Sequence, residues 1–395
     1  MGALLRYVGI QGLVGLMKDQ RIKFVALLYL LLSFIILFRV GVYSEGEAVK
    51  YINDATRILS HQGLDRGVFA INYIVYSLLL AIVLKFGISF FVIAAMQIIL
   101  SLIAGLAIYK ILFKITGNFI TSILSCLLFL SCLTIQEWNY FLYTESFHVS
   151  FTVIALYFFY DIAVNKRFDR AGIFILVVFL IVFSRPVGII YLLSLAPVTI
   201  ILLYHKNKRI FYLSLFLSFL GLFSILCSHW IFYLNPDSLR RMEVICQVPT
   251  AGNHLPYAEY NTAGLLAFFK VITNDIGILN FLILGCKKLT SFFIMIRPFY
   301  SSIHNLLLLV TIFIFYPLAF FGAVLYKNSK SFYIKLFICF YLAYTSFGIF
   351  FTCDEWSNRF IVPVLPMIII LAGLGFEYII QKISGNKEKD IINVN

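Results

Sequence analysis

The residues best suited to acid–base chemistry lie in one polar stretch, Gly41 to Gly67, just after the first strongly apolar run. A carboxylate takes a proton from a hydroxyl when the two groups are held within hydrogen-bond reach. The whole sequence contains 18 acidic residues, and four of them lie in this stretch: Glu45, Glu47, Asp54 and Asp65. We therefore interpret it as a catalytic loop.

Glu47 is the first candidate for a general base. From Glu47 onward, apolar residues recur at helical spacing, which predicts a short amphipathic helix on the membrane surface. These residues are Val49, Ile52, Ala55 and Leu59. The positive end of a helix dipole keeps a carboxylate ionised and able to accept a proton. Glu47 is equally typical of an acid that only stabilises the first turn of a helix, and that alternative stays open.

A second carboxylate, Glu145, stands at the start of a later apolar run, where Thr144 is placed to cap the helix. A carboxylate at membrane depth usually faces a polar cavity. Glu145 is thus either a partner of the first loop or part of a helix cap. The neighbouring residues Trp138, Tyr140 and Tyr143 fit interfacial anchoring, and His148 is interpreted as a packing residue.

Several cations stand near the same side of the predicted membrane. Arg185 lies in a break between two apolar runs, Arg297 precedes a Pro, Arg359 lies in the last turn, and His304 opens a later run. Fixed cations stabilise the charge that develops on a leaving phosphate. Each cation also fits a simple contact with lipid head groups.

Composition indicates which elements must position these groups. The chain has 395 residues, of which 62% are hydrophobic and 12% charged, which is typical of a polytopic all-α membrane protein. The net charge of +13 is interpreted as Lys and Arg in cytoplasmic loops and on anionic lipid, with no nucleic-acid partner.

The apolar runs predict roughly ten transmembrane helices. The predicted spans are Ile22–Val42, Ile88–Tyr109, Phe119–Ile135, Phe147–Asp161, Ile173–Ser184, Val187–Tyr204, Ile210–Leu234, Ile303–Tyr326, Phe332–Phe351 and Phe360–Ile380.

Two further apolar runs, Val68–Phe86 and Ile276–Phe299, are ambiguous by length. If both stay outside as juxtamembrane helices, all six clusters of Lys and Arg fall on the cytoplasmic side, as the positive-inside rule prefers. We therefore expect a single membrane domain with cytoplasmic termini. Its predicted parts include a first external loop (43–87), a long external loop (235–302) and a cytoplasmic tail (381–395). The sequence leaves open whether Cys246 and Cys286 pair.

The order of these motifs resembles that of the C-type integral-membrane glycosyltransferases, the superfamily that includes protein mannosyltransferases and aminoarabinose transferases. Its members show an acid soon after the first span, then a Tyr and an Ala. Glu47, Tyr51 and Ala55 match this pattern, and Lys50 stands where a basic residue often precedes the Tyr. Glu145, Arg185 and the Arg359 segment resemble the later motifs.

The resemblance implies an inverting transferase in the cytoplasmic (inner) membrane, with its active site facing the outside or periplasm. Its donor would be a polyprenyl-phosphate-linked sugar, and its acceptor a lipid-linked glycan, a lipid or a protein. Glu47 would be the base. Glu145 would orient the acceptor or hold a divalent metal, the one cofactor considered. The predicted donor-phosphate ligands are Lys50, Arg185, Arg297 and Arg359, with Glu45, Tyr51 and His304 in support. The alternatives are a flippase of lipid-linked sugars and a polysaccharide polymerase.

Overall fold

The computed structural model describes residues 19–63, 71–204, 243–245, 269–352 and 358–392. The predicted span Ile210–Leu234, the acid Asp65, Cys246 and the parts 235–242 and 246–268 of the long external loop lie outside the described residues. Within the described ranges the chain is helical and forms no strand beyond one isolated β-bridge. The all-α prediction is therefore confirmed for these parts.

Six helices in the described ranges are long and apolar enough to cross a bilayer, or seven if one bent pair counts as a span. The six are α3 (Gln20–Val40), α7 (Phe91–Thr116), α10 (Glu145–Ala163), α18 (Ser302–Val324), α19 (Phe332–Phe351) and α20 (Leu365–Ile392). Each overlaps a predicted span, and most ends agree within a few residues. The exceptions are the end of α7, seven residues beyond Tyr109, and the two ends of α20. This helix begins five residues after Phe360 and continues through most of the predicted tail.

The remaining predicted spans are shorter or broken. The run Phe119–Ile135 forms α8 (Phe119–Ser131), then α9 (Leu133–Gln136) and the 3-10 turn η1 (Glu137–Tyr140), with a bend of 56°. The next two are α11 (Ala171–Val182) and α12 (Gly188–Tyr204), which contain 12 and 17 residues. A helix of 12 residues is about 18 Å long, less than the hydrocarbon core of a bilayer.

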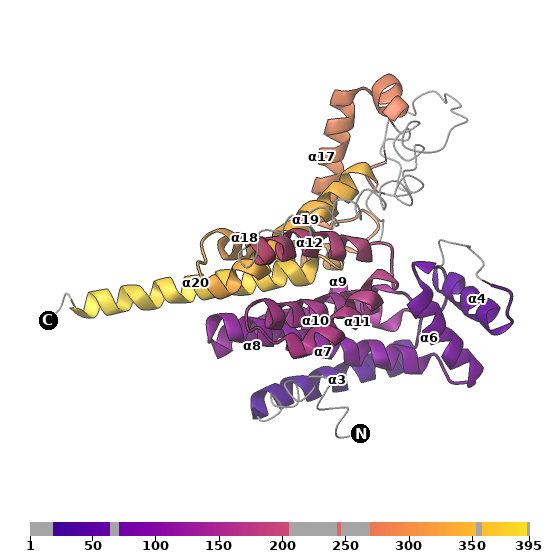
Figure 1. Cartoon of the computed structure of the whole chain (residues 1–395), viewed down its shortest axis with the longest axis horizontal. Coiled ribbons are helices and arrows are strands. Elements are labelled where there is room, and N and C mark those ends of the chain that lie inside the picture. Colours follow the sequence, from indigo (N-terminus) through magenta and orange to yellow (C-terminus); the bar gives the residue numbers. More distant parts are fainter. Residues whose placement is uncertain (1–18, 64–70, 205–242, 246–268, 353–357, 393–395) are drawn as a thin grey trace. The chain divides into compact units, whose positions relative to one another are not determined.

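The described chain divides into two compact units, whose boundaries fall inside α12, α18 and α19. Unit 1 comprises residues 1–192, 315–335 and 365–395. In it, α7 packs against α3, α8, α10 and α20, so this helix lies at the centre of the bundle (Figure 1).

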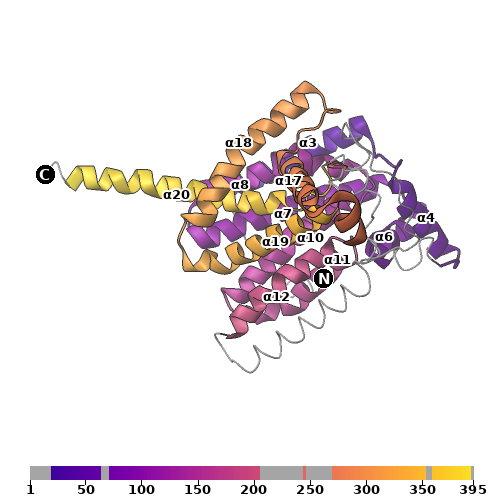
Figure 2. The same ribbon diagram turned by 90° about the horizontal axis from the view of Figure 1, so that it is seen from above.

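A helical hairpin stands at one end of unit 1. It pairs α4 (Ala48–Leu59) with α6 (Ile74–Lys85), and the two views in Figures 1 and 2 both place it at the end opposite the C-terminus of α20. The ambiguous run Val68–Phe86 thus gives a helix of 12 residues, too short to span. This length agrees with the predicted juxtamembrane helix.

Two glycines allow a close contact between α18 and α20 in unit 1. A Cβ added at Gly322 on α18 would lie 1.9 Å from the carbonyl oxygen of Leu371 on α20. A Cβ at Gly375 would lie 1.9 Å from the carbonyl oxygen of Leu318. The backbones of the two helices therefore touch where both carry no side chain, as is common between membrane helices.

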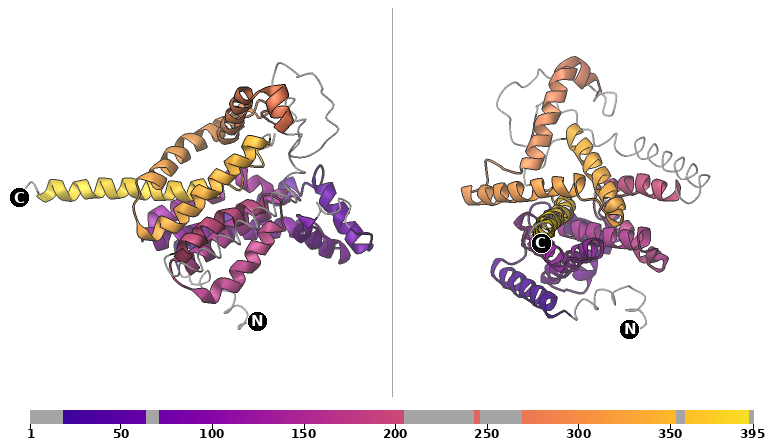
Figure 3. Two further views of the ribbon diagram at one scale, coloured as in Figure 1. Left: turned by 45° about the horizontal axis from the view of Figure 1, so that its top comes forward. Right: turned by 90° about the vertical axis from the view of Figure 1, so that its left-hand side faces the viewer.

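Unit 2 comprises residues 193–314 and 336–364. Its described helices include the π-turn η4 (Val271–Ile276) and α17 (Ile278–Ile294), drawn in orange in Figure 3. Phe281 and Leu284 of α17 pack with Val271 and Ile272 in a small apolar core. The second ambiguous run, Ile276–Phe299, thus yields a helix of 17 residues.

Candidate functional site

Glu47 immediately precedes α4, where the sequence predicted a helix, and its side chain makes no capping hydrogen bond. Lys50 Nζ donates a hydrogen bond to Glu47 Oε1 at 3.1 Å, and the Lys50 and Glu47 side chains are 52% and 34% exposed. An exposed helical pair of this kind is worth about 0.3–0.5 kcal/mol. The pair therefore holds the carboxylate near the ammonium but breaks easily when another anion approaches Lys50.

The loop before α4 is fastened to the second turn that the sequence singled out. Tyr43 N–H donates to the Tyr140 carbonyl at 2.8 Å, and Leu142 N–H donates to the Tyr43 carbonyl at 3.0 Å. The Glu47 N–H donates to the Tyr143 hydroxyl at 3.1 Å. The loop before α4 and the turn at residues 140–143, far apart in sequence, are thus joined by hydrogen bonds beside Glu47.

Gly46 makes this contact possible. Its φ of +63° lies in the left-handed region that favours glycine, and a Cβ there would lie 2.8 Å from the Tyr143 hydroxyl oxygen. Tyr143 was predicted to be an interfacial anchor; in the structure its ring is buried and its hydroxyl binds the loop.

Tyr51, on α4, feels the charge of both carboxylates that the sequence selected. Its side chain is buried, and its ring packs against the rings of Tyr73 and Tyr76 at centroid distances of 5.3 and 5.5 Å. Burial raises the pKa of Tyr51, and the negative charges of Glu145 and Glu47 raise it further, whereas Arg185 lowers it. The charges of Glu47, Glu145 and Arg185 therefore all act on the Tyr51 hydroxyl.

Glu145 and Arg185 form a buried ion pair. Arg185 Nη1 lies 3.2 Å from Glu145 Oε1, and the two side chains are 6% and 0% exposed. The predicted break positions Arg185: α11 ends at Val182, and α12 starts at Gly188, where a Cβ would lie 2.3 Å from the Ile181 carbonyl oxygen. The tight turn needs glycine and directs the guanidinium to α10.

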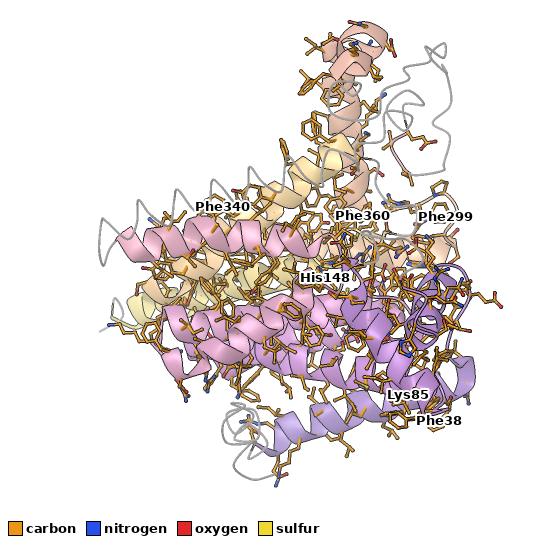
Figure 4. The ribbon with its side chains drawn as sticks, turned by 45° about the vertical axis from the view of Figure 1, so that its right-hand side comes forward. Phe38, Lys85, His148, Phe299, Phe340 and Phe360 are labelled. Atoms are coloured by element: carbon orange, nitrogen blue, oxygen red, sulfur yellow. The ribbon has the colours of Figure 1, made fainter. Side chains whose placement is uncertain are left out.

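His148, one turn after Glu145, is buried inside unit 1, in contrast to the exposed Lys85 (Figure 4). Its Nδ1 lies 3.3 Å from the Ser184 hydroxyl oxygen. Among the described residues, no group of three or more His, Cys, Asp or Glu side chains is placed to hold a metal ion. A divalent metal held by Glu145 stays a prediction.

A network of buried hydrogen bonds stabilises the turn that precedes Glu145. The Asn139 amide nitrogen donates to Gln136 Oε1 at 2.8 Å, and the Ser146 hydroxyl donates to Asn139 Oδ1 at 2.5 Å. Gln97 on α7 donates through Nε2 to the carbonyls of Trp138 and Phe141 at 2.9 and 3.0 Å. These contacts fix the backbone that leads into Glu145.

Sequence reasoning gave no role to Gln97 or Asn139, and it named Asp54 only as one of the four acidic residues of the polar stretch. Gln97 carries a visible signal, since a glutamine within a strongly apolar run usually binds a partner inside the bundle. Asp54 is fully buried and shares one face of α4 with Ala48, Tyr51 and Ala55. The buried face of α4 is therefore not the face that the apolar spacing predicted, because Val49 and Leu59 are 46% and 37% exposed.

The other predicted phosphate ligands belong to unit 2. Arg297 is buried at the end of α17, where its Nη1 donates to the Ser291 carbonyl and hydroxyl oxygens, each at 3.0 Å. Arg359 is 7% exposed. His304 stacks on Tyr300 with ring centroids 4.2 Å apart. The structure thus brings together Glu47, Lys50, Tyr51, Glu145 and Arg185 in unit 1, and the phosphate role of Arg297 and Arg359 stays a prediction.

Lys288 is a buried cation of unit 2 that lies outside the predicted site residues. It is 0% exposed and precedes Ser291, the residue that binds Arg297, by one turn of α17. Burial lowers its pKa to about 8, against the opposing charge of Glu243.

No protein-family model matches this chain, and comparisons with curated proteins and with solved structures likewise find no similar protein.

Proposed function

We propose that the protein is an inverting glycosyltransferase that takes its sugar from a polyprenyl-phosphate donor and works at the outer face of the cytoplasmic membrane. The observation that carries this proposal is the charged group at one end of an apolar bundle: Glu47 with Lys50, and the buried pair of Glu145 and Arg185. Charges are costly at membrane depth and usually mark a site of binding or chemistry.

In the proposed reaction, an acceptor hydroxyl attacks the anomeric carbon of the sugar. A new carbon–oxygen bond forms on one side as the bond to the phosphate oxygen breaks on the other, so the configuration inverts. Glu47 takes the proton of the hydroxyl, and the leaving phosphate keeps the bonding electrons. General-base assistance of this kind is worth about 10²–10⁴-fold in rate.

Lys50 links donor binding to the base. Because Lys50 pairs with Glu47 in a weak, half-exposed contact, a phosphate that binds Lys50 draws the ammonium away from the carboxylate. Glu47 is then available for the acceptor proton. Glu145 stays paired with Arg185 and, with Tyr51, forms a fixed polar wall against which the acceptor is oriented.

The test is release of free polyprenyl phosphate in proteoliposomes loaded with a lipid-linked sugar pool. Glu47→Gln should lose turnover by about 10²-fold or more while retaining donor binding. Asp169→Asn is the control, because the Asp169 side chain is 60% exposed and is none of the predicted site residues, and it should keep most of the activity.

Full turnover in Glu47→Gln would remove Glu47 as the base. Passage of intact sugar-lipid across the bilayer, without cleavage in either protein, would favour a flippase. A product that grows by repeated addition of whole glycan units would favour the polymerase.

A further inference from the structure

A second charged cluster lies at the opposite end of α10 from Glu145. Lys110 and Lys114 lie one turn apart on α7, and Arg170 ends the 3-10 turn η2 (Phe168–Arg170). All three cations surround the ring of Tyr157 on α10. Their charged atoms lie 5.6, 5.0 and 5.6 Å from its centroid for Lys110, Lys114 and Arg170. We call Lys110, Lys114, Arg170 and Tyr157 the basic cluster.

One buried carboxylate, Asp161, faces the basic cluster, and both of its oxygens are occupied. Oδ1 accepts from Lys114 and from the Asn165 amide, the latter at 2.7 Å, and Oδ2 accepts from Arg170. Arg170 also donates to the Tyr157 hydroxyl at 2.8 Å. A single negative charge therefore serves two of three cations.

Lys110 is the one cation of the basic cluster that Asp161 does not pair with in the described part of the chain. It is 7% exposed, and it forms no ion pair within the part of the chain that the structure describes. An ammonium removed from water is unfavourable without a counter-charge, and the nearby Lys114 and Arg170 add repulsion. An anion placed beside Lys110 would relieve both effects.

Lys114 is the partly exposed cation beside Lys110. The Lys114 side chain is 33% exposed, whereas Arg170 and Asp161 are 4% and 0% exposed. An anion that reaches Lys114 from solvent or from the lipid surface therefore approaches Lys110 on the same face of α7, one turn away.

We propose that the basic cluster binds a phosphate group, with Lys110 and Lys114 as its direct ligands and with Asp161 and Arg170 fixing their positions. Lysine binds phosphate as a point charge through strong charge-assisted hydrogen bonds. The phosphate comes either from the head group of an anionic lipid or from solution. No residue of the basic cluster takes part in the proposed transfer reaction, so the two proposals stand or fall separately.

The experiment is lipid binding to the purified full-length protein in detergent, measured by native mass spectrometry with dioleoylphosphatidylglycerol. Dioleoylphosphatidylcholine is the neutral reference lipid. Lys110→Gln should raise the dissociation constant for phosphatidylglycerol about tenfold, the usual effect of losing one charged hydrogen bond. Lys110→Arg should bind like the wild type.

Lys327→Gln is the matched control. Lys327 is exposed in the loop whose next residue, Asn328, donates to the Ile115 carbonyl at the end of α7 at 3.1 Å. It therefore removes a charge at the same end of the bundle without touching the basic cluster, and its affinity should match that of the wild type.

Inorganic phosphate identifies the source. Displacement of bound phosphatidylglycerol by millimolar phosphate indicates a site for the free ion, and no displacement indicates a lipid head group. Wild-type affinity in Lys110→Gln, an equal loss in Lys327→Gln, or equal binding of both lipids with no effect of phosphate would overturn the proposal. If Lys110→Gln does not fold, Lys114→Gln gives the same comparison.

Discussion

The buried ion pair of Glu145 and Arg185 should contribute to the stability of unit 1. Arg185→Gln leaves the buried Glu145 carboxylate without its cation, which should lower the free energy of unfolding by about 3–5 kcal/mol. Arg185→Lys keeps the charge and should cost less. Thermal unfolding in detergent, followed by tryptophan fluorescence, measures the difference.

The control for this prediction is Arg167→Gln. Arg167 pairs with Asp169 at 3.0 Å, but the two side chains are 50% and 60% exposed. An exposed pair is worth about 1 kcal/mol or less. Equal shifts at Arg185 and Arg167 would show that the buried pair adds nothing beyond an ordinary surface contact.

Lys288 predicts a pH dependence of stability. Its pKa in the folded protein is about 8, below the ordinary value of 10.5. Between these pH values the unfolded chain binds more protons, so the free energy of unfolding should rise with pH, by about 1.4 kcal/mol per pH unit. Below pH 8 both states are protonated and this contribution is constant.

The measurement is the unfolding temperature of the wild type and of Lys288→Met from pH 7.5 to 10.5. The wild type should gain stability relative to Lys288→Met across this range. Parallel curves would mean that Lys288 titrates near its ordinary value.

At the scale of elements, the contact of α18 and α20 depends on two glycines. Gly375→Ala places a methyl group against the Leu318 carbonyl, where the Cβ would lie 1.9 Å from the oxygen. The helices must then separate, which should destabilise unit 1 by about 1–3 kcal/mol. Gly172→Ala on α11 is the control, since nothing lies within 4 Å of its Cβ position. Both variants are compared by thermal unfolding, and equal stability would contradict the contact.

Local patterns in the sequence predicted much of the site but not its pairings. Helical spacing located α4 with Glu47 and Tyr51 on it, and the start of an apolar run located Glu145. The pairing of Glu145 with Arg185 depends on how α10 packs near the turn between α11 and α12, and no local pattern encodes that contact.

The bend after α8 was also missed, for a related reason. The span Phe119–Ile135 was predicted as continuous, because neither Pro nor Gly interrupts it. The chain nevertheless leaves the helix at Cys132, with φ −68° and ψ 102°, an extended conformation open to any residue. The polar side chain of Gln136, which donates to the Phe129 carbonyl at 2.9 Å, holds the bend through a contact within the fold.

At the scale of the whole molecule, the two charged ends of unit 1 should lie on opposite sides of the membrane. A cysteine at Gln62, exposed just after α4, should react with a membrane-impermeant maleimide in intact cells when native cysteines are replaced. A cysteine at Lys330, exposed in the loop near the end of α7, should react only after the cells are opened. Labelling of both positions in intact cells would contradict the topology.

The contact between Glu47 and Tyr143 has a consequence for how the protein is made. The two residues are separated by 96 positions, and α6, α7 and α8 lie between them. During synthesis, α4 emerges long before the turn that fastens its loop. The charged end of unit 1 therefore assembles only after α7 and α8 have entered the membrane. A nascent chain that stalls before Tyr143 has Glu47 but lacks the Tyr143 hydroxyl that binds its backbone. The proposed reaction at this end would therefore require that α7 and α8 are already inserted.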